Sequence, residues 1–112
     1  MKQSPIFSQT YDFVKWLLPV TVGFPRQQRF VIAAVLQQEA LNFQGLLIEA
    51  VHQPDPHPKL DAANAELDKL RTHLRLCHDL KLISHGQYEQ AAKNLSEMGC
   101  LLGGWKKSLD QV

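Results

Sequence analysis

Apolar residues recur three and four positions apart along most of the chain, which is the pattern of helices that each bury one face. This spacing predicts four helices, over about residues 5–22, 25–51, 59–83 and 86–109. No segment alternates convincingly between apolar and polar residues, so no strand is predicted. The 112 residues are the size of one domain, and the predicted fold is all-α, an antiparallel four-helix bundle over residues 1–112.

Breakers set the bounds of the first helix. Pro19 lies inside it and predicts a kink or an early end, because proline lacks an N–H and clashes with the preceding turn. Gly23 predicts the stop, and Pro25 is expected to open the second helix. The stripe predicted to face the core consists of Ile6, Thr10, Phe13, Leu17, Val20 and Phe24.

The second helix has an unusually broad apolar surface. Beyond a regular stripe, four further positions (Phe30, Ala34, Leu41 and Ile48) are apolar, which predicts a helix covered on more than one side. The regular stripe consists of Ile32, Leu36, Ala40, Phe43, Leu47 and Ala50.

The third and fourth helices carry the most regular stripes. Three prolines in residues 52–58 (HQPDPHP) predict a loop before them, and Ser84 with Gln87 forms a capping box between them. The third stripe is Leu60, Ala63, Leu67, Leu70, Leu74 and Cys77, and the fourth is Tyr88, Ala91, Leu95, Met98, Leu102, Trp105 and Leu109.

Composition favours a soluble cytoplasmic protein. The longest apolar runs, residues 16–22 and 30–36, are far shorter than the ~20 residues that cross a bilayer, and no secretory signal is visible. The two cysteines therefore read as free thiols. Cys77 fits a small core residue, and its offset from Cys100 across the predicted hairpin is too large for a disulfide.

No catalytic or metal-binding pattern is present. His73, Cys77 and His78 lie on neighbouring turns and are the best candidate ligands, but a structural zinc site needs four. Nucleophile-elbow, Walker and dinucleotide-binding motifs are absent. We therefore expect no enzyme activity, no metal and no cofactor. Gly99 and Gly103, four residues apart, predict the close approach of another helix.

Charge is nearly balanced overall and uneven along the chain. Twelve Lys and Arg face eleven Asp and Glu, for a net charge of +1. Residues 1–35 hold four bases against one acid, residues 36–70 two against six, and residues 71–112 six against four. These basic residues fit either ordinary solvated charges or contacts to phosphates and acidic partners.

Four stretches resemble the Avd family, the accessory variability determinants of diversity-generating retroelements. Residues 23–30 (GFPRQQRF) resemble its FPR-x-QRF element, and residues 70–80 (LRTHLRLCHDL) resemble its LR-xx-LRL-xx-DL helix. Residues 83–89 (ISHGQYE) and 99–108 (GCLLGGWKKS) resemble its hairpin and its LGGW-x-KS ending. The similarity runs from about Pro5 to Ser108. The family is distantly related to the bundle protein encoded in ribosomal RNA intervening sequences.

The resemblance implies a homopentameric barrel of four-helix bundles without enzymatic activity. It further implies that the protein binds a reverse transcriptase and its template RNA or cDNA, and so supports mutagenic retrohoming. Family members often carry arginine where this chain has Val35 and Cys100. The residues that the resemblance assigns to binding transcriptase or nucleic acid are Arg26, Arg29, Arg71, Arg75, Lys106 and Lys107.

The near-neutral charge keeps an alternative open. The chain could be an oligomeric interaction module of the same fold, like the intervening-sequence protein, with no role in reverse transcription.

Overall fold

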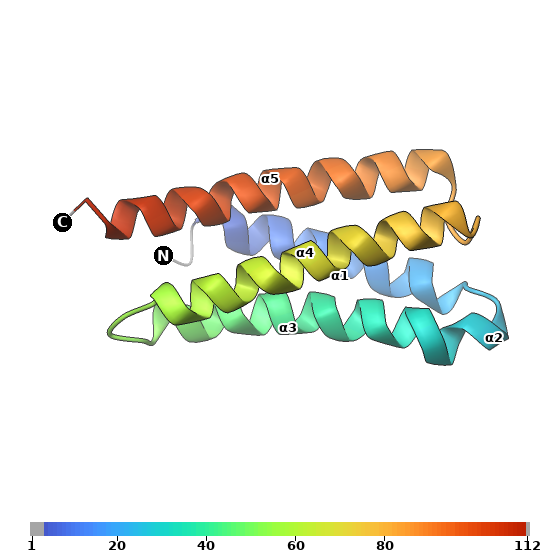
Figure 1. The fold of residues 1–112 in the computed structure, drawn as a ribbon, viewed down its shortest axis with the longest axis horizontal. Coiled ribbons are helices and arrows are strands. Elements are labelled where there is room, and N and C mark those ends of the chain that lie inside the picture. The colour runs from blue at the N-terminus through green and yellow to red at the C-terminus, as the bar shows by residue number, and fades with distance from the viewer. Residues whose placement is uncertain (1–3, 112) are drawn as a thin grey trace.

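Four long antiparallel helices form one elongated bundle in the computed structural model, which describes residues 4–111 (Figure 1). The bundle measures 48 × 23 × 21 Å. Within the described residues all regular structure is helical, so the predicted four-helix fold is confirmed. The elements are α1 (Pro5–Val22), α2 (Arg26–Gln28), the π-helix η1 (Arg29–Ala33), α3 (Ala34–Val51), α4 (His57–Asp79) and α5 (His85–Leu109).

The core is a single apolar layer in which every long helix takes part. The predicted stripes of α3 and α4 are confirmed at all their positions, and the α5 stripe is fully buried in its centre. Tyr88, Trp105 and Leu109 at the two ends of α5 are only half-buried. The two ends of the α5 stripe are therefore less well covered than its centre.

The first helix spans Pro5–Val22, so Pro19 does not end it early. Its buried stripe differs from the prediction at one position. Thr21 is fully buried in place of the predicted Val20, because its hydroxyl donates to the Leu17 and Leu18 carbonyls at 3.1 and 2.9 Å. Gln37 of α3 in turn donates to this hydroxyl at 2.8 Å, so the polar side chain links two helices.

The second helix is not continuous α-helix. Pro25 precedes it as the N-cap residue instead of opening it, and a five-residue π-helix, η1, separates α2 from α3. A π turn contains an additional residue per turn and is often found at functional sites. Gly23, which ends α1, has a right-handed φ of −75°, so it is not a left-handed glycine stop.

The helix α4 is shifted relative to the predicted third helix, residues 59–83. It starts at His57, inside the expected loop, with Pro58 in the first turn, where the missing N–H is not needed. It ends at Asp79, four residues before the predicted end. The Leu82 N–H donates to the Cys77 carbonyl at 2.8 Å and the Lys81 N–H to the His78 carbonyl at 3.0 Å, which together form a Schellman motif.

The helix α5, the predicted fourth helix, begins with the predicted capping box. Ser84 accepts from the Gln87 N–H at 3.0 Å, and the Gln87 side chain accepts from the Ser84 N–H at 2.9 Å. The Schellman motif and the capping box together define both sides of the short α4–α5 turn.

We expect Lys81→Gly to stabilise the protein. Lys81 is exposed and has a φ of +62°, the left-handed region that costs a side chain about 1–2 kcal/mol and glycine almost nothing. After the entropic cost of glycine in the unfolded chain, a net gain of about 0.5–1 kcal/mol is expected in urea unfolding. Lys93→Gly, in the middle of α5, is the control and should cost about 1 kcal/mol. Equal destabilisation by both variants would show that the left-handed backbone at Lys81 carries no strain.

Candidate protein and nucleic-acid interface

Arg26 and Arg29 lie at the α1–α2 turn, at one end of the bundle (Figure 1). The preceding residue Phe24 is buried and anchors this turn in the core. The Nε of Arg29 donates to the Phe24 carbonyl at 3.0 Å, so this arginine helps to hold the turn while its side chain stays exposed. Arg26 is exposed, and no ion pair involves it among residues 4–111.

The π-helix that follows presents two apolar side chains to solvent. Phe30 is 83% exposed and Val31 is 65% exposed, whereas their neighbours Ile32 and Ala33 are buried. The same end of the bundle carries two exposed leucines, Leu76 in the last turn of α4 and Leu80 just after that helix. Cations and apolar side chains therefore occur together at this end.

Arg71 on α4 is held against α5. Its guanidinium pairs with Asp68 at 2.9 Å and reaches toward the Leu95 carbonyl at 3.5 Å. It lies directly over Gly99, since a Cβ at that position would come within 2.5 Å of Nη2. The close approach predicted at Gly99 is thus made by an arginine side chain, while a Cβ at Gly103 would meet nothing within 4 Å.

Arg75 is in a different environment, although it lies only one turn further along α4. It is exposed and makes no ion pair or side-chain hydrogen bond within the described part of the chain. Together with Arg26 it is therefore available to a partner, whereas Arg71 is already engaged by the bundle itself.

Lys106 and Lys107 lie near the carboxyl end of α5, at the opposite end of the bundle from Arg26 (Figure 1). Lys106 pairs with Asp61 of α4 at 2.7 Å and ties the two helices together. Lys107 is exposed and unpaired among residues 4–111. The six candidate residues thus occupy three separate places, and one compact ligand could not contact all of them on a single chain.

One flank of α3 exposes apolar side chains. Leu41 and Ile48, two turns apart on the same face, are 43% and 50% exposed, and Val51 beside them is 38% exposed. Val35 is also 38% exposed but lies about 120° around the helix from Leu41. Within one chain the helix is covered on one side only, so the predicted second cover is not supplied by the chain itself. The stretch Arg26–Val51 reaches a mean hydropathy of 1.3 over its most apolar 18 residues, and by length and composition alone it could cross a membrane. Its fully buried Leu36, Phe43 and Leu47 show that one face of it forms the core of the bundle.

The three residues weighed as metal ligands do not converge. His73 contacts Glu39 of α3 at 2.8 Å, and Cys77 is fully buried in the core as expected. Burial raises the pKa of the Cys77 thiol to about 11, so it is unreactive at neutral pH. Cys100 is exposed, both cysteines are free, and His78 lies at the α4–α5 turn.

His57 connects the α3–α4 loop to the residue that follows α5, at the end of the bundle opposite Arg26. Its Nδ1 lies 2.7 Å from Asp55, and its Nε2 lies 2.9 Å from Asp110, just beyond α5. Hydrogen bonds to Asp55 and then to Asp110 raise the pKa of His57 above its ordinary value of 6.5. The same bond to His57 lowers the pKa of Asp55. When it is protonated, the imidazole donates to both carboxylates and links the α3–α4 loop to the residue just beyond α5.

In a comparison with protein families, residues 5–109 match the bAvd-like family model. No curated protein matches the chain. Among solved structures, the bundle resembles a protein of unknown function from the S23 ribosomal protein family of Bacteroides thetaiotaomicron, with a TM-score of 0.84. The two sequences are 20% identical, and the alignment covers 96% of this chain and 99% of the other. At that identity the likeness establishes the fold.

We expect NMR titration to give His57 a pKa above 6.5, because the folded protein favours its charged form. The stability that it contributes is fully present below the unfolded-state pKa and is lost as pH rises through the higher folded-state pKa. Asp110→Asn should lower the His57 pKa. The remaining hydrogen bond to Asp55 should keep this pKa above the ordinary value of 6.5. Asp12→Asn on α1 is the control of equal charge change and should leave this pKa unaltered. An unchanged His57 pKa in Asp110→Asn would refute the bridge.

Proposed function

The chain belongs to the bAvd-like family, and from that premise we propose that it is a non-enzymatic accessory protein of a diversity-generating retroelement. It binds the reverse transcriptase of the element together with template RNA or cDNA, and so supports mutagenic retrohoming. The observation that carries this proposal is the family match across almost the whole bundle, residues 5–109. The chemistry then belongs to the transcriptase, and this protein supplies binding and positioning.

A homopentameric barrel is the assembly that we propose for it in the cytoplasm. The exposed flank of α3 supports this assembly, because Leu41, Ile48 and Val51 expose apolar area that a second copy can cover. Each buried Å² of apolar surface contributes about 25 cal/mol, so a row of such side chains repeated at every interface favours association. In a ring, each free cation is also repeated around the axis, which strengthens the field that an acidic partner meets.

Arg26 and Arg75 are the leading candidates for contacts to the transcriptase or to phosphates. Both are exposed, and neither has a charged partner within the described residues. Arg29, Arg71 and Lys106 already hold a carbonyl or a carboxylate of the bundle, so they act first as structural cations. Lys107 is the third free cation of the proposed set, and it would serve a contact at the opposite end.

The assembly is tested by light scattering on the purified protein. The expected mass is five times the 12.7 kDa of the chain. Ile48→Asp places a charge on the exposed flank of α3 and should dissociate the assembly while circular dichroism stays helical. Tyr11→Asp, at a site 60% exposed on α1, is the control and should leave the mass unchanged. A wild-type mass of one chain would overturn the pentamer.

The partner is tested by co-purification with the reverse transcriptase of the proposed retroelement. We expect Arg26→Ala with Arg75→Ala to weaken association by up to about 30-fold, because each exposed ion pair contributes up to ~1 kcal/mol. The matched control is Lys15→Ala with Lys93→Ala, which removes the same charge from two other exposed positions.

The same two double variants test nucleic acid. For template RNA, each lost phosphate contact should flatten the dependence of log affinity on log salt by ~0.7–0.9. Equal effects of the two double variants would refute the residue assignment. A wild-type protein that binds neither transcriptase nor RNA would favour the alternative, an oligomeric interaction module with no role in reverse transcription.

A further inference from the structure

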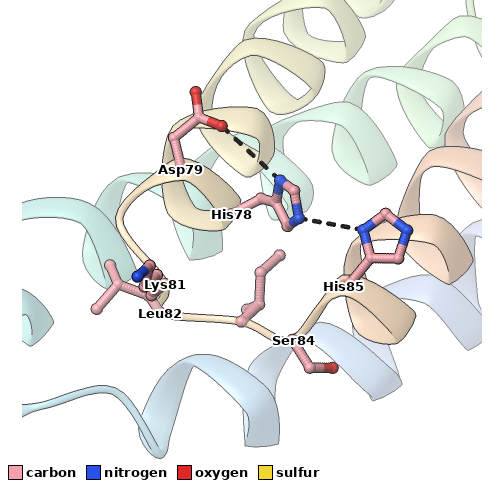
Figure 2. A pocket seen from close by; sticks show the side chains of 7 residues that line it. His78, Asp79, Lys81, Leu82, Ser84 and His85 are labelled. Carbon is pink, nitrogen blue, oxygen red and sulfur yellow. Dashed lines mark hydrogen bonds and ion pairs between the residues drawn. The ribbon is translucent and has the colours of Figure 1, made fainter.

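Two histidines face each other across the α4–α5 turn, outside every contact discussed above. The Nε2 of His78, in the last turn of α4, lies 3.3 Å from the Nδ1 of His85, the first residue of α5 (Figure 2). Figure 2 shows both rings turned toward one another above the short loop that joins the helices. The residues are seven positions apart, so the turn itself brings them together.

The surrounding structure holds the His78 ring and the backbone of the turn in place. The His78 ring is stacked on Tyr88, with the ring centroids 4.5 Å apart and the planes 15° from parallel. The Schellman motif at the end of α4 and the Ser84–Gln87 capping box determine the backbone on both sides of the turn. The short distance between the two nitrogens therefore follows from a well-determined backbone and one stacked ring.

The outward nitrogen of each ring faces a carboxylate. The Nδ1 of His78 lies 3.8 Å from Asp79, and the Nε2 of His85 lies 3.6 Å from Glu89. Such neighbours favour the tautomers that carry a hydrogen on the outward nitrogens. In that state both inward nitrogens hold lone pairs that a cation can accept. Without a cation, one ring donates a hydrogen bond to the other across the 3.3 Å.

We propose that His78 and His85 form a binding site for a divalent transition-metal ion, with Zn²⁺ as the best fit. Zinc binds imidazole at ~2.0–2.1 Å, and a tetrahedral arrangement then places two such nitrogens ~3.3–3.4 Å apart. The 3.3 Å between Nε2 and Nδ1 matches this tetrahedral nitrogen–nitrogen distance. It exceeds the ~2.8–3.0 Å that two neighbouring ligands have in octahedral or square-planar coordination at the same bond length.

Solvent completes the coordination. The described residues contain no group of three or more histidine, cysteine or acidic side chains that could hold a metal ion, so the protein supplies two ligands. The site borders an open hollow lined by Lys81, Leu82, Ile83 and Ser84, in which water has room for the other two positions (Figure 2). Asp79 and Glu89 together outweigh the single positive charge of Lys81 beside it.

Zinc titration calorimetry on the folded protein tests the site. The experiment uses a Cys100→Ser background, because that exposed thiol would itself bind zinc, whereas Cys77 is buried. We expect one Zn²⁺ per chain. His85→Ala should lower the affinity by more than the ~10–100-fold typical of losing an outer-shell partner. His52→Ala, which removes an exposed histidine from the α3–α4 loop, is the matched control and should leave the affinity unchanged.

Two further measurements address folding and atom assignment. The His85 side chain is 72% exposed, so circular dichroism of His85→Ala should match the parent. Long-range ¹H–¹⁵N spectra should show zinc-induced shifts at Nε2 of His78 and Nδ1 of His85, and Glu89→Gln should weaken binding about tenfold. Zinc affinity equal in His85→Ala and its parent, or rings that take up a proton and no zinc, would overturn the proposal.

Discussion

Burial of one apolar stripe on each of the four long helices is the constraint on which the rest of the structure depends. Full burial of a side chain such as Leu36, Phe43 or Leu67 contributes about 1.5–3 kcal/mol, whereas an exposed ion pair contributes up to ~1 kcal/mol. The stripes therefore determine how each helix is rotated about its own axis. That rotation in turn determines which residues face outward, including the second apolar surface of α3 and the exposed Arg75 of α4.

The stripes were also what the sequence predicts best, because periodicity depends on local spacing alone. The errors occur where two choices have equal spacing or where a side chain changes the local balance. Val20 and Thr21 both fit between Leu17 and Phe24, and the hydrogen bonds of the Thr21 hydroxyl decide in favour of the polar residue. The π turn of η1 interrupts the predicted continuous helix, and no local pattern in the sequence indicates it.

The candidate site was less predictable, because the role of a cation depends on neighbours that are distant in sequence. Arg71 and Arg75 are equivalent by spacing, yet only Arg71 meets a glycine and a carbonyl on α5. The partner of His78 is likewise His85, across a turn, and neither the helical neighbour Cys77 nor His73. Sequence spacing identifies residues on one helix face, whereas these contacts join two helices whose relative register the sequence does not state.

The net charge of +1 acquires a different meaning once the ion pairs are known. All six acids of the central segment, residues 36–70, contact a base or a histidine, and most of these contacts link α4 to a neighbouring element or run along it. Among the described residues, only Asp12 and Glu97 lack such a partner. The cations without an acidic partner there are Lys15, Arg26, Arg29, Arg75, Lys81, Lys93 and Lys107. A pair at 3 Å has little field at a distance, whereas unpaired charges act over the ~8 Å Debye length of physiological salt. Five of the paired acids, Glu39, Asp55, Asp79, Glu89 and Asp110, contact only histidine, so their charge is neutralised only where that ring is protonated. With neutral histidines the free acids and the free cations balance, and the near-zero formal charge conceals separate basic and acidic places on the surface.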